Sequence, residues 1–167
     1  TMQLREDLQL QTAIRALVEV IAPAVDAGNA LAVEQTQIVI GMLQLMAARL
    51  PLQYQYDCDE LARLVDLSRA LEDHDGRLAT ARAAGAEVLA RAQATPQELL
   101  AAIRNLRKLS GAVITAAYRD GDDATRTSVS KHVLAHAEQQ LLRERAWFAP
   151  QGWELQPESL PDIENLL

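Results

Sequence analysis

The sequence predicts an all-α protein, an up-and-down bundle of four to five helices with an irregular C-terminal tail. Hydrophobic residues make up 49% of the 167 residues but aromatic residues only 4%, so the core consists of Leu, Val, Ile and Ala. Ala and Leu are the strongest helix formers. The 6 prolines and 7 glycines are too few for the many turns of a β-sandwich. Along most of the chain, apolar residues recur three or four positions apart, which is the spacing of helices.

The first expected helix covers residues 3–27, with Pro23 inside it. Because proline lacks a backbone N–H and its ring clashes with the preceding turn, we expect this helix to kink or end near Ala22. Gly28 and Asn29 indicate a stop and a restart, with Asn29 as the N-cap of the next helix.

The next helix, from Ala30 to Leu50, is expected to lie at the centre of the bundle. Between Ile38 and Met46 its apolar side chains point in nearly every direction, so neighbours or lipid must cover it. Polar residues interrupt it too often for the roughly 20 apolar residues of a membrane span. They are Glu34, Gln35, Gln37, Gln44 and Arg49. Pro51 is expected to end the helix, because the residue before a proline is driven out of the α region.

Residues 52–57 alternate Leu or Tyr with Gln, which we interpret as an extended connection whose tyrosines lean on the bundle. A third helix is expected to begin at Asp57 or Asp59. The segment 73–76, Asp-His-Asp-Gly, is either a break in this helix or a strained continuation, and helical spacing resumes at Leu78. The pattern leaves both readings open.

Two long helices are expected to complete the bundle. Thr95, Pro96 and Glu98 form a capping box with proline at the first helical position, so a helix should start there and stop near Gly121. The last helix is expected over residues 124–148, and its apolar side consists of Val133, Leu134, Ala137, Leu141 and Phe148. We expect residues 1–148 to form one domain and residues 149–167 a tail packed on the bundle, because Trp147, Phe148 and Trp153 gather near the junction.

Charge and cysteine content limit the partners. A net charge of −7 argues against binding nucleic acid and against docking on anionic membranes. A single cysteine, Cys58, excludes an internal disulfide and fits a reducing compartment. The first residues lack the basic and apolar pattern of a signal peptide, so the expected location is the cytoplasm.

The three histidines are candidate metal ligands. His132 and His136 are four residues apart on one expected helix, so both can face one ion. His74 comes from an earlier helix. One histidine in mid-chain followed by His-x-x-x-His in the last long helix resembles the spacing in the metal-binding bundles of the DinB/YfiT family. The resemblance implies a divalent-metal-dependent hydrolase or thiol transferase, with His74, His132 and His136 as ligands.

Helical geometry favours a different position for two of these histidines. At about 100° per residue, His132 and His136 lie more than about 100° from the apolar face around Val133 and Leu134. We therefore expect them to face solvent near Arg143. No cofactor is expected from the sequence, with one divalent metal ion as the alternative.

A second candidate site is a basic helix face made of Arg104, Arg107 and Lys108. Guanidinium groups bind phosphates and carboxylates, so this face can hold an anionic ligand. In a chain this acidic, ion pairs with its own carboxylates are the simpler interpretation. The expected partners are Asp66, Glu72, Asp73 and Asp75.

The sequence indicates no catalytic residues. Asp57 and Asp59 flank Cys58 and should raise its pKa, which disfavours a nucleophilic thiolate. No Gly-x-Ser-x-Gly elbow or phosphate-binding glycine loop occurs. We therefore expect a small soluble interaction or assembly protein without catalytic activity, a homodimer or a binder of another protein. The alternatives are the metal-binding bundle and a bundle that binds a small anion.

Overall fold

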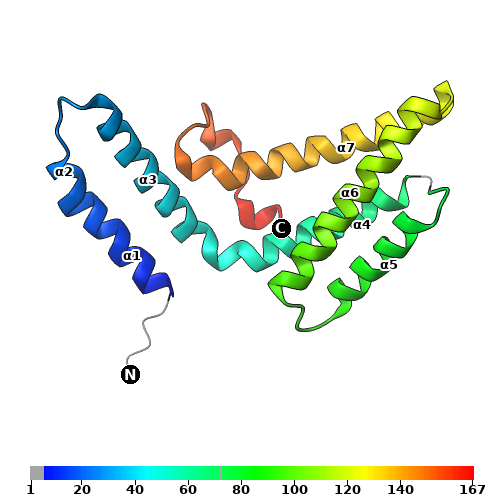
Figure 1. Cartoon of the computed structure of the whole chain (residues 1–167), viewed down its shortest axis with the longest axis horizontal. Coiled ribbons are helices and arrows are strands. Elements are labelled where there is room, and N and C mark those ends of the chain that lie inside the picture. Colours follow the sequence, from blue (N-terminus) through cyan, green and yellow to red (C-terminus); the bar gives the residue numbers. More distant parts are fainter. Residues whose placement is uncertain (1–5, 72) are drawn as a thin grey trace. The chain divides into compact units, whose positions relative to one another are not determined.

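The computed structural model describes residues 6–71 and 73–167, and this part of the chain is helical throughout, with no strand (Figure 1). The predicted all-α class is confirmed, because the helices pack against one another. Residues 3–5 of the first expected helix and Glu72, a predicted ion-pair partner, lie outside the described residues.

Seven α-helical segments and several short turns follow one another along the described chain. They are α1 (Glu6–Ala16), a π-helical turn (Leu17–Ile21), α2 (Ala22–Ala24), α3 (Ala30–Arg49), a 3-10 turn (Leu50–Leu52), α4 (Gln53–Arg69), α5 (Arg77–Ala90), α6 (Pro96–Asp120), α7 (Asp123–Phe148) and three further 3-10 turns (Ala149–Gln151, Pro157–Ser159 and Ile163–Asn165).

By its internal contacts the chain divides into two compact units. Unit 1 comprises Thr1–Gln53 and Glu144–Ile163, and unit 2 comprises Tyr54–Arg143 and Glu164–Leu167. The predicted division into a bundle of residues 1–148 and a tail of residues 149–167 stays a prediction.

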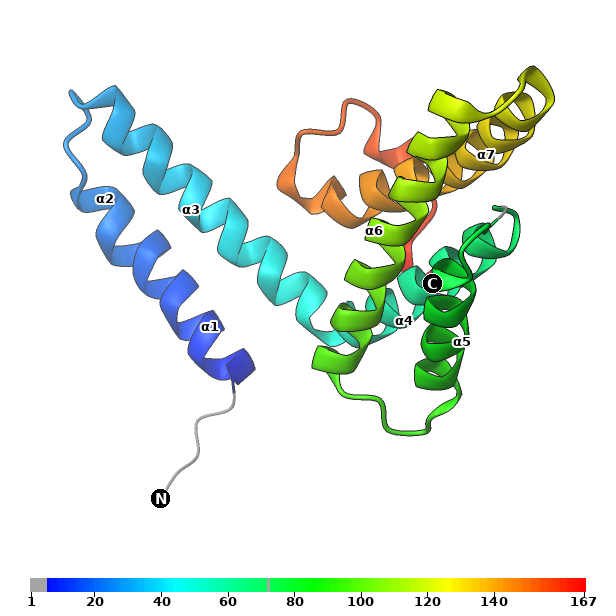
Figure 2. The ribbon, with the colours of Figure 1, turned by 45° about the vertical axis from the view of Figure 1, so that its right-hand side comes forward.

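Unit 1 contains a helical hairpin in which α1 runs beside α3 (Figures 1 and 2). The half-buried residues of the first helical segment are spaced for a single face: Leu10, Ile14 and Leu17. The π-helical turn lies directly before Pro23, which has no N–H to continue the ordinary ladder. The first helix ends at Ala24, close to the predicted position. Asn29 caps α3 as predicted, because its side chain accepts a hydrogen bond from the Ala32 N–H at 3.1 Å.

The start of α4 corrects one prediction. The chain does not form an extended connection over residues 52–57, and the helix begins at Gln53 rather than at Asp57 or Asp59. Pro51 lies in the 3-10 turn that leads into the helix. A backbone N–H at this position would have no intrahelical acceptor, so the helix loses no hydrogen bond to the proline. The alternation of tyrosine and glutamine therefore belongs to a helix. The segment 73–76 is a break, since α4 ends at Arg69 and α5 begins after Gly76, whose φ is +74°.

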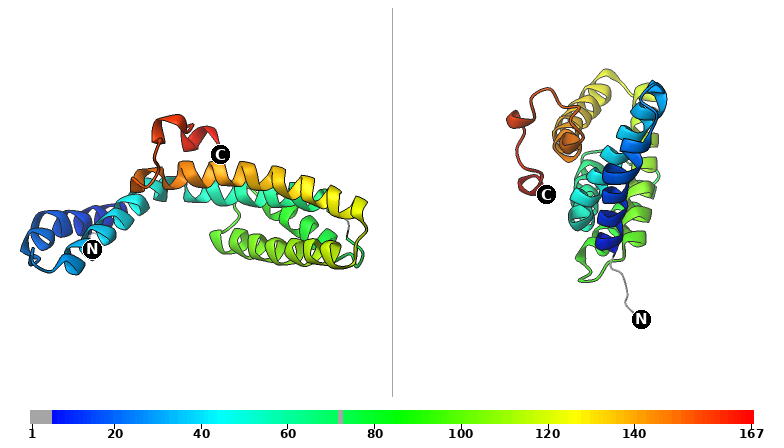
Figure 3. Two further views of the ribbon diagram at one scale, coloured as in Figure 1. Left: turned by 90° about the horizontal axis from the view of Figure 1, so that it is seen from above. Right: turned by 90° about the vertical axis from the view of Figure 1, so that its left-hand side faces the viewer.

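Unit 2 encloses the main hydrophobic core between α4, α5, α6 and the first part of α7. The views agree that α5 and α6 lie side by side, and Figure 3 shows α7 running along α4. The buried core residues are Leu61, Leu64, Val65, Leu71, Leu78, Ala81, Ala94, Leu99, Ile103, Leu106 and Val129. Gly85 permits close packing here, because a Cβ at this position would lie 3.1 Å from Leu106 Cδ1. The core is thus aliphatic, as the composition predicts.

The boundaries of α6 and α7 are close to those predicted. At the start of α6, Thr95 Oγ1 accepts a hydrogen bond from the Glu98 N–H, while the Glu98 carboxylate accepts one from the Thr95 N–H. This confirms the capping box. Helix α6 ends at Asp120, immediately before Gly121, and α7 begins at Asp123.

The aromatic residues near the tail differ in burial. Trp147 is buried, together with Ala146 and Ile163, whereas Phe148 is 47% exposed and Trp153 is 75% exposed. Trp153 and the 95% exposed Leu155 therefore do not anchor the tail. Arg49 donates hydrogen bonds to the carbonyl oxygens of Trp147 and Ala146, and its guanidinium lies 5.4 Å from the Trp147 ring centre.

Helix α3 is not the covered central helix that its apolar sequence predicts. Among its described residues, only Ile40 and Leu45 are buried. The hairpin gives the helix one long neighbour, and one neighbour cannot cover a helix that is apolar over most of its circumference. By length and composition alone, one helical stretch, Ala30–Arg69, is apolar enough to cross a membrane, a test that core helices of soluble proteins also pass.

Candidate functional site

The exposed side of α3 is the most conspicuous surface of unit 1. We call Leu31, Ile38, Val39, Met42 and Met46 the α3 stripe. At about 100° per residue these side chains lie on one side of the helix, and each of them is exposed. Leu8, Val18, Val20 and Ile21, in the helical segment beside it, are exposed as well. Soluble monomers rarely leave contiguous apolar areas of this kind uncovered, so the surface is a candidate interface.

Two polar residues occupy a different side of the same helix. Gln37 and Gln44 lie roughly opposite the α3 stripe and are exposed, whereas the exposed Gln35 lies within the arc of the stripe and Glu34 lies beside it. Residues 35–48 carry no charged side chain. Helix α3 therefore has one side against α1, one polar side, and one apolar side that nothing in unit 1 covers.

The three predicted metal ligands do not gather around one point. His74 is exposed in the turn between α4 and α5, and it borders a cavity beside α5, α6 and α7. His132 and His136 border a different and smaller hollow, beside Arg63 and Asp66 of α4. Within residues 6–71 and 73–167, no group of three His, Cys, Asp or Glu side chains is placed to hold a metal ion.

The side of α7 that packs inward differs from the predicted one. His132 and His136 are half-buried, as is Val133 of the predicted apolar side, whereas Leu134, Ala137 and Leu141 are exposed. The helix packs through a side that also contains the buried Val129 and Arg143. The prediction assumed that the most apolar side faces the core. Here the opposing helix α4 presents carboxylates, and these select the polar side of α7 instead.

The environment of His136 favours its neutral form. Burial lowers the pKa of His136 below its ordinary value, and the positive charges of Arg63, Arg143 and Arg107 lower it further, while Glu60 acts in the opposite direction. Two guanidinium groups beside a neutral imidazole also oppose the approach of a metal cation. This histidine therefore serves packing better than metal binding.

The lowered pKa of His136 predicts a pH dependence of stability. As the pH falls below about 6.5, the ordinary value, the unfolded chain takes up this proton before the folded chain does, so the folded state loses stability. The variant His136→Gln should lose less stability than the wild type over this range. Urea unfolding at pH 7.5, 6.5 and 5.5 measures the difference, with His74→Gln as the exposed control. Parallel pH profiles of the wild type and His136→Gln would contradict the expectation.

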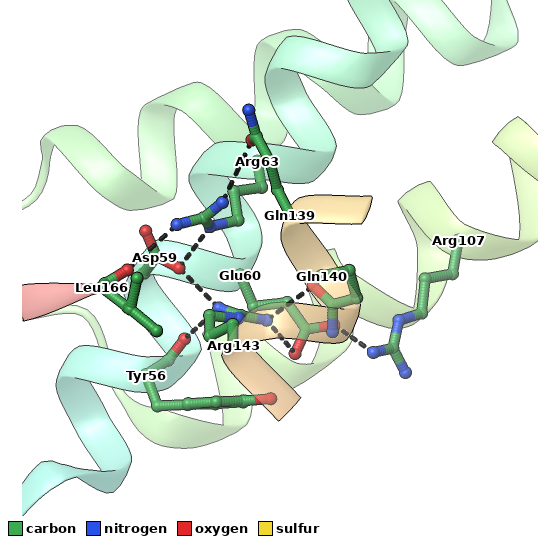
Figure 4. Close-up of polar contacts among 9 residues, drawn as sticks. All are labelled: Tyr56, Asp59, Glu60, Arg63, Arg107, Gln139, Gln140, Arg143 and Leu166. Atoms are coloured by element: carbon green, nitrogen blue, oxygen red, sulfur yellow. Dashed lines mark hydrogen bonds and ion pairs between the residues drawn. The ribbon is translucent and has the colours of Figure 1, made fainter. Parts of the chain in front are cut away.

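Arg143 is the centre of a buried polar network in unit 2 (Figure 4). Its side chain, from α7, is 0% exposed. It donates to Asp59 Oδ2 at 2.5 Å, to Glu60 Oε2 at 3.4 Å and to Gln140 Oε1 at 2.9 Å. Its guanidinium also lies 4.1 Å from the ring centre of Tyr56. Because an unpaired buried charge is costly, these contacts fix the position of α7 against α4.

Two further arginines complete the network from its edges. Arg63 Nε donates to Asp59 Oδ2 at 2.6 Å, and its other nitrogens reach Gln139 Oε1 at 3.2 Å and the carbonyl oxygen of Leu166 at 3.0 Å. Arg107, from α6, pairs with Glu60. The two carboxylates thus join α4 to α6 and α7, while Arg63 joins α4 to Leu166, which is a structural role.

The predicted anion face is partly used within the protein. Arg107 pairs with a carboxylate of the chain, in the manner expected, although the partner is Glu60 rather than Asp66, Asp73 or Asp75. Arg104 and Lys108 are exposed on the same helix. Neither residue lines the cavity at His74 or the hollow at His132 and His136.

Cys58 lies in an environment that suppresses its reactivity. Burial raises the pKa of the Cys58 thiol above its ordinary value, and the carboxylate of Asp57 raises it too, while a hydrogen bond with Tyr54 acts in the opposite direction. A thiol that stays protonated is a weak nucleophile. The structure supports the same conclusion as the sequence here.

Comparison with known proteins identifies no relative, because no family model, curated protein or solved structure matches the chain. The spacing of the three histidines therefore has no support from a matching family.

Sequence reasoning missed Arg143 and its partners. Asp59 and Arg63 are four residues apart on one helix, a spacing that often places an ion pair on the surface. Val129, His136 and Arg143 recur every seven residues along α7. This seven-residue spacing indicates that the side of α7 with Val129, His136 and Arg143 packs on the bundle, rather than the side with Leu134 and Leu141.

Proposed function

We propose that this chain is a non-enzymatic assembly protein that associates with a second copy of itself through the hairpin of unit 1. The observation that carries the proposal is the exposed α3 stripe. Met42 is 52% exposed and Met46 is 57% exposed, in the middle of a long stretch without charge. Burial of such side chains stabilises an interface by about 25 cal/mol for each Å² of apolar surface removed from water.

The hairpin is large enough for such an interface. Two helices of about 20 residues, each about 30 Å long and about 10 Å wide, present a side of roughly 600 Å² even when treated as flat. A stable interface buries about 800 Å² on each partner. The estimate already includes the side chains, so one side of the hairpin, at roughly 600 Å², lies at the lower end of the range for stable interfaces, about 1,200–2,000 Å² over both partners.

A second copy fits this surface better than lipid or a charged partner. The chain carries a net charge of −7, so two copies repel each other unless they meet through uncharged residues, and residues 35–48 are such a region. Gln37 and Gln44 on the other side of α3 stay in water when two hairpins pair, whereas a bilayer that α3 spans would enclose them. Two paired hairpins form a four-helix bundle with two-fold symmetry.

The arrangement of the remaining candidate residues gives less support to the other functions considered. A metal-dependent enzyme of the DinB/YfiT type needs His74, His132 and His136 around one ion, and they border different hollows. An anion-binding site needs free cations around a cavity, and Arg107 is already paired with Glu60.

The proposal is tested by placing charges on two sides of the same helix. The variant Met42→Glu/Met46→Glu puts two carboxylates into the α3 stripe and should weaken self-association at least 100-fold. The matched control, Gln37→Glu/Gln44→Glu, adds the same charge to the polar side and should leave association unchanged. Size-exclusion chromatography with light scattering over a range of concentrations measures both, and circular dichroism verifies that both variants keep their helices.

Three outcomes would overturn the proposal. One is a wild-type chain that stays monomeric. Another is equal association of both variants with the wild type. The third is co-sedimentation of the wild type with phosphatidylcholine vesicles that Met42→Glu/Met46→Glu abolishes, since this would assign the α3 stripe to a lipid surface.

A further inference from the structure

Unit 2 contains a cavity that neither the proposed interface nor the Arg143 network uses. Its volume is about 410 Å³, and it lies beside the start of α5, the second half of α6 and the first part of α7. Its apolar lining includes Leu78, Leu109, Val113 and Val129. Leu78 and Val129 are buried members of the core, whereas Asp75, Asp120 and Ser128 at the rim are exposed, so the cavity is open to solvent on one side. Ligand pockets in proteins measure about 300–1,000 Å³ and have mostly apolar walls.

Small side chains on α6 leave room for the cavity. It is lined by the half-buried Ala116 and Ala117 and by the exposed Ala112, where larger side chains would fill the space. A cavity of about 410 Å³ has room for roughly ten to fourteen non-hydrogen atoms, if each occupies about the 30 Å³ of a water molecule.

The charged groups at the rim already neutralise one another. Asp75 pairs with Arg77 at 2.7 Å, and Asp120 pairs with Arg119 at 2.7 Å. A hydrogen bond from the Arg77 backbone N–H and one from its guanidinium lower the pKa of the Asp75 carboxyl group, and the hydrogen bond from Arg119 lowers the pKa of Asp120, so both are ionised at neutral pH and both have a cationic partner. Because these carboxylates are already paired, they favour an uncharged ligand over a cationic one; His74 also borders the cavity. The remaining polar groups of the lining include the hydroxyls of Thr125 and Ser128, which both donate and accept hydrogen bonds.

From this lining we propose that the cavity is a binding site for a small uncharged molecule that is mainly apolar and carries one hydroxyl group. The apolar part lies between Leu78, Leu109, Val113 and Val129. The hydroxyl group lies at the rim, within reach of Thr125 or Ser128. This site is independent of the proposed self-association, because all of its residues belong to unit 2.

The test uses 1-naphthol, an uncharged fluorescent probe of suitable size with a single hydroxyl group. Ala116→Trp fills the cavity and should weaken 1-naphthol binding at least tenfold. The matched control, Ala101→Trp, puts the same side chain on the exposed side of α6, away from the cavity, and should bind as the wild type does. Met42→Glu/Met46→Glu should also bind normally, which separates the cavity from the α3 stripe.

Methyl NMR of the wild type provides a second measurement that does not depend on the folding of any variant. Addition of 1-naphthol should shift the methyl signals of Leu109, Val113 and Val129. Shifts confined to the methyl groups of unit 1, absence of saturable binding, or undiminished binding to a folded Ala116→Trp variant would each overturn the proposal.

Discussion

Arg143→Ala should lower the free energy of unfolding by about 3–5 kcal/mol, the loss typical of removing one partner from a buried ion pair. Arg143 is fully buried and donates to Asp59, Glu60 and Gln140. Without it, both carboxylates keep only the partners at the edge of the network, Arg63 and Arg107. Solvent does not screen a fully buried group, so the loss should be close to this range. Urea unfolding followed by circular dichroism measures it.

A matched arginine on the surface provides the control. Arg119 is 72% exposed and pairs with Asp120 at 2.7 Å. Exposed pairs of this kind contribute little to stability, so Arg119→Ala should leave the unfolding midpoint nearly unchanged. Equal effects of Arg143→Ala and Arg119→Ala would show that the buried network does not hold α7 against α4.

Leu106→Ala should destabilise the chain by about 2–5 kcal/mol, because Leu106 is fully buried in the core of unit 2. The same variant should change the effect of Gly85→Ala. In the wild type, a Cβ at Gly85 lies 3.1 Å from Leu106 Cδ1, so the methyl group crowds the core. In the Leu106→Ala background that atom is absent, while Leu61 Cδ1 and Val65 Cγ2 still lie 3.3 Å from the position of the Cβ. Gly85→Ala should then destabilise the chain less than it does in the wild type, because the space left by Leu106 relieves part of the crowding and the better helix propensity of Ala contributes up to about 1 kcal/mol.

A second glycine, Gly111, provides a control that measures the effect of helix propensity without a change in packing. A Cβ at Gly111 on α6 meets nothing within 4 Å. Gly111→Ala should therefore add about 1 kcal/mol of stability in both backgrounds, since only helix propensity changes. A double-mutant cycle compares the pairs, and sites in contact show a coupling energy that distant sites lack. An equal effect of Gly85→Ala in both backgrounds would contradict the close packing of α5 against α6.

Much of the fold was predictable from local signals in the sequence. The Asn29 cap, the capping box at Thr95 and the helix end before Gly121 each depend on a few neighbouring residues, and each is found where it was expected. The break before α5 was recognisable as one of two alternatives. These features depend on backbone hydrogen bonds that nearby side chains complete, so they do not require knowledge of the tertiary fold.

Features that depend on distant residues were not predictable in this way. The side of α7 that packs inward is selected by Asp59 and Glu60, more than 80 residues earlier in the chain. The apolar pattern of α7 alone therefore predicted the wrong side, and it placed His132 and His136 in solvent. The sequence also did not predict that α3 is exposed. An apolar helix needs packing partners, but its own sequence does not specify whether these come from the same chain or from another molecule.

Sedimentation equilibrium of the wild-type chain over a hundredfold range of concentration measures self-association directly. The mass should approach twice the chain mass of 18.3 kDa as the concentration rises, because two hairpins cover each other's α3 stripe. A mass of 18.3 kDa at every concentration would contradict this expectation, since Met42 and Met46 would then remain in water.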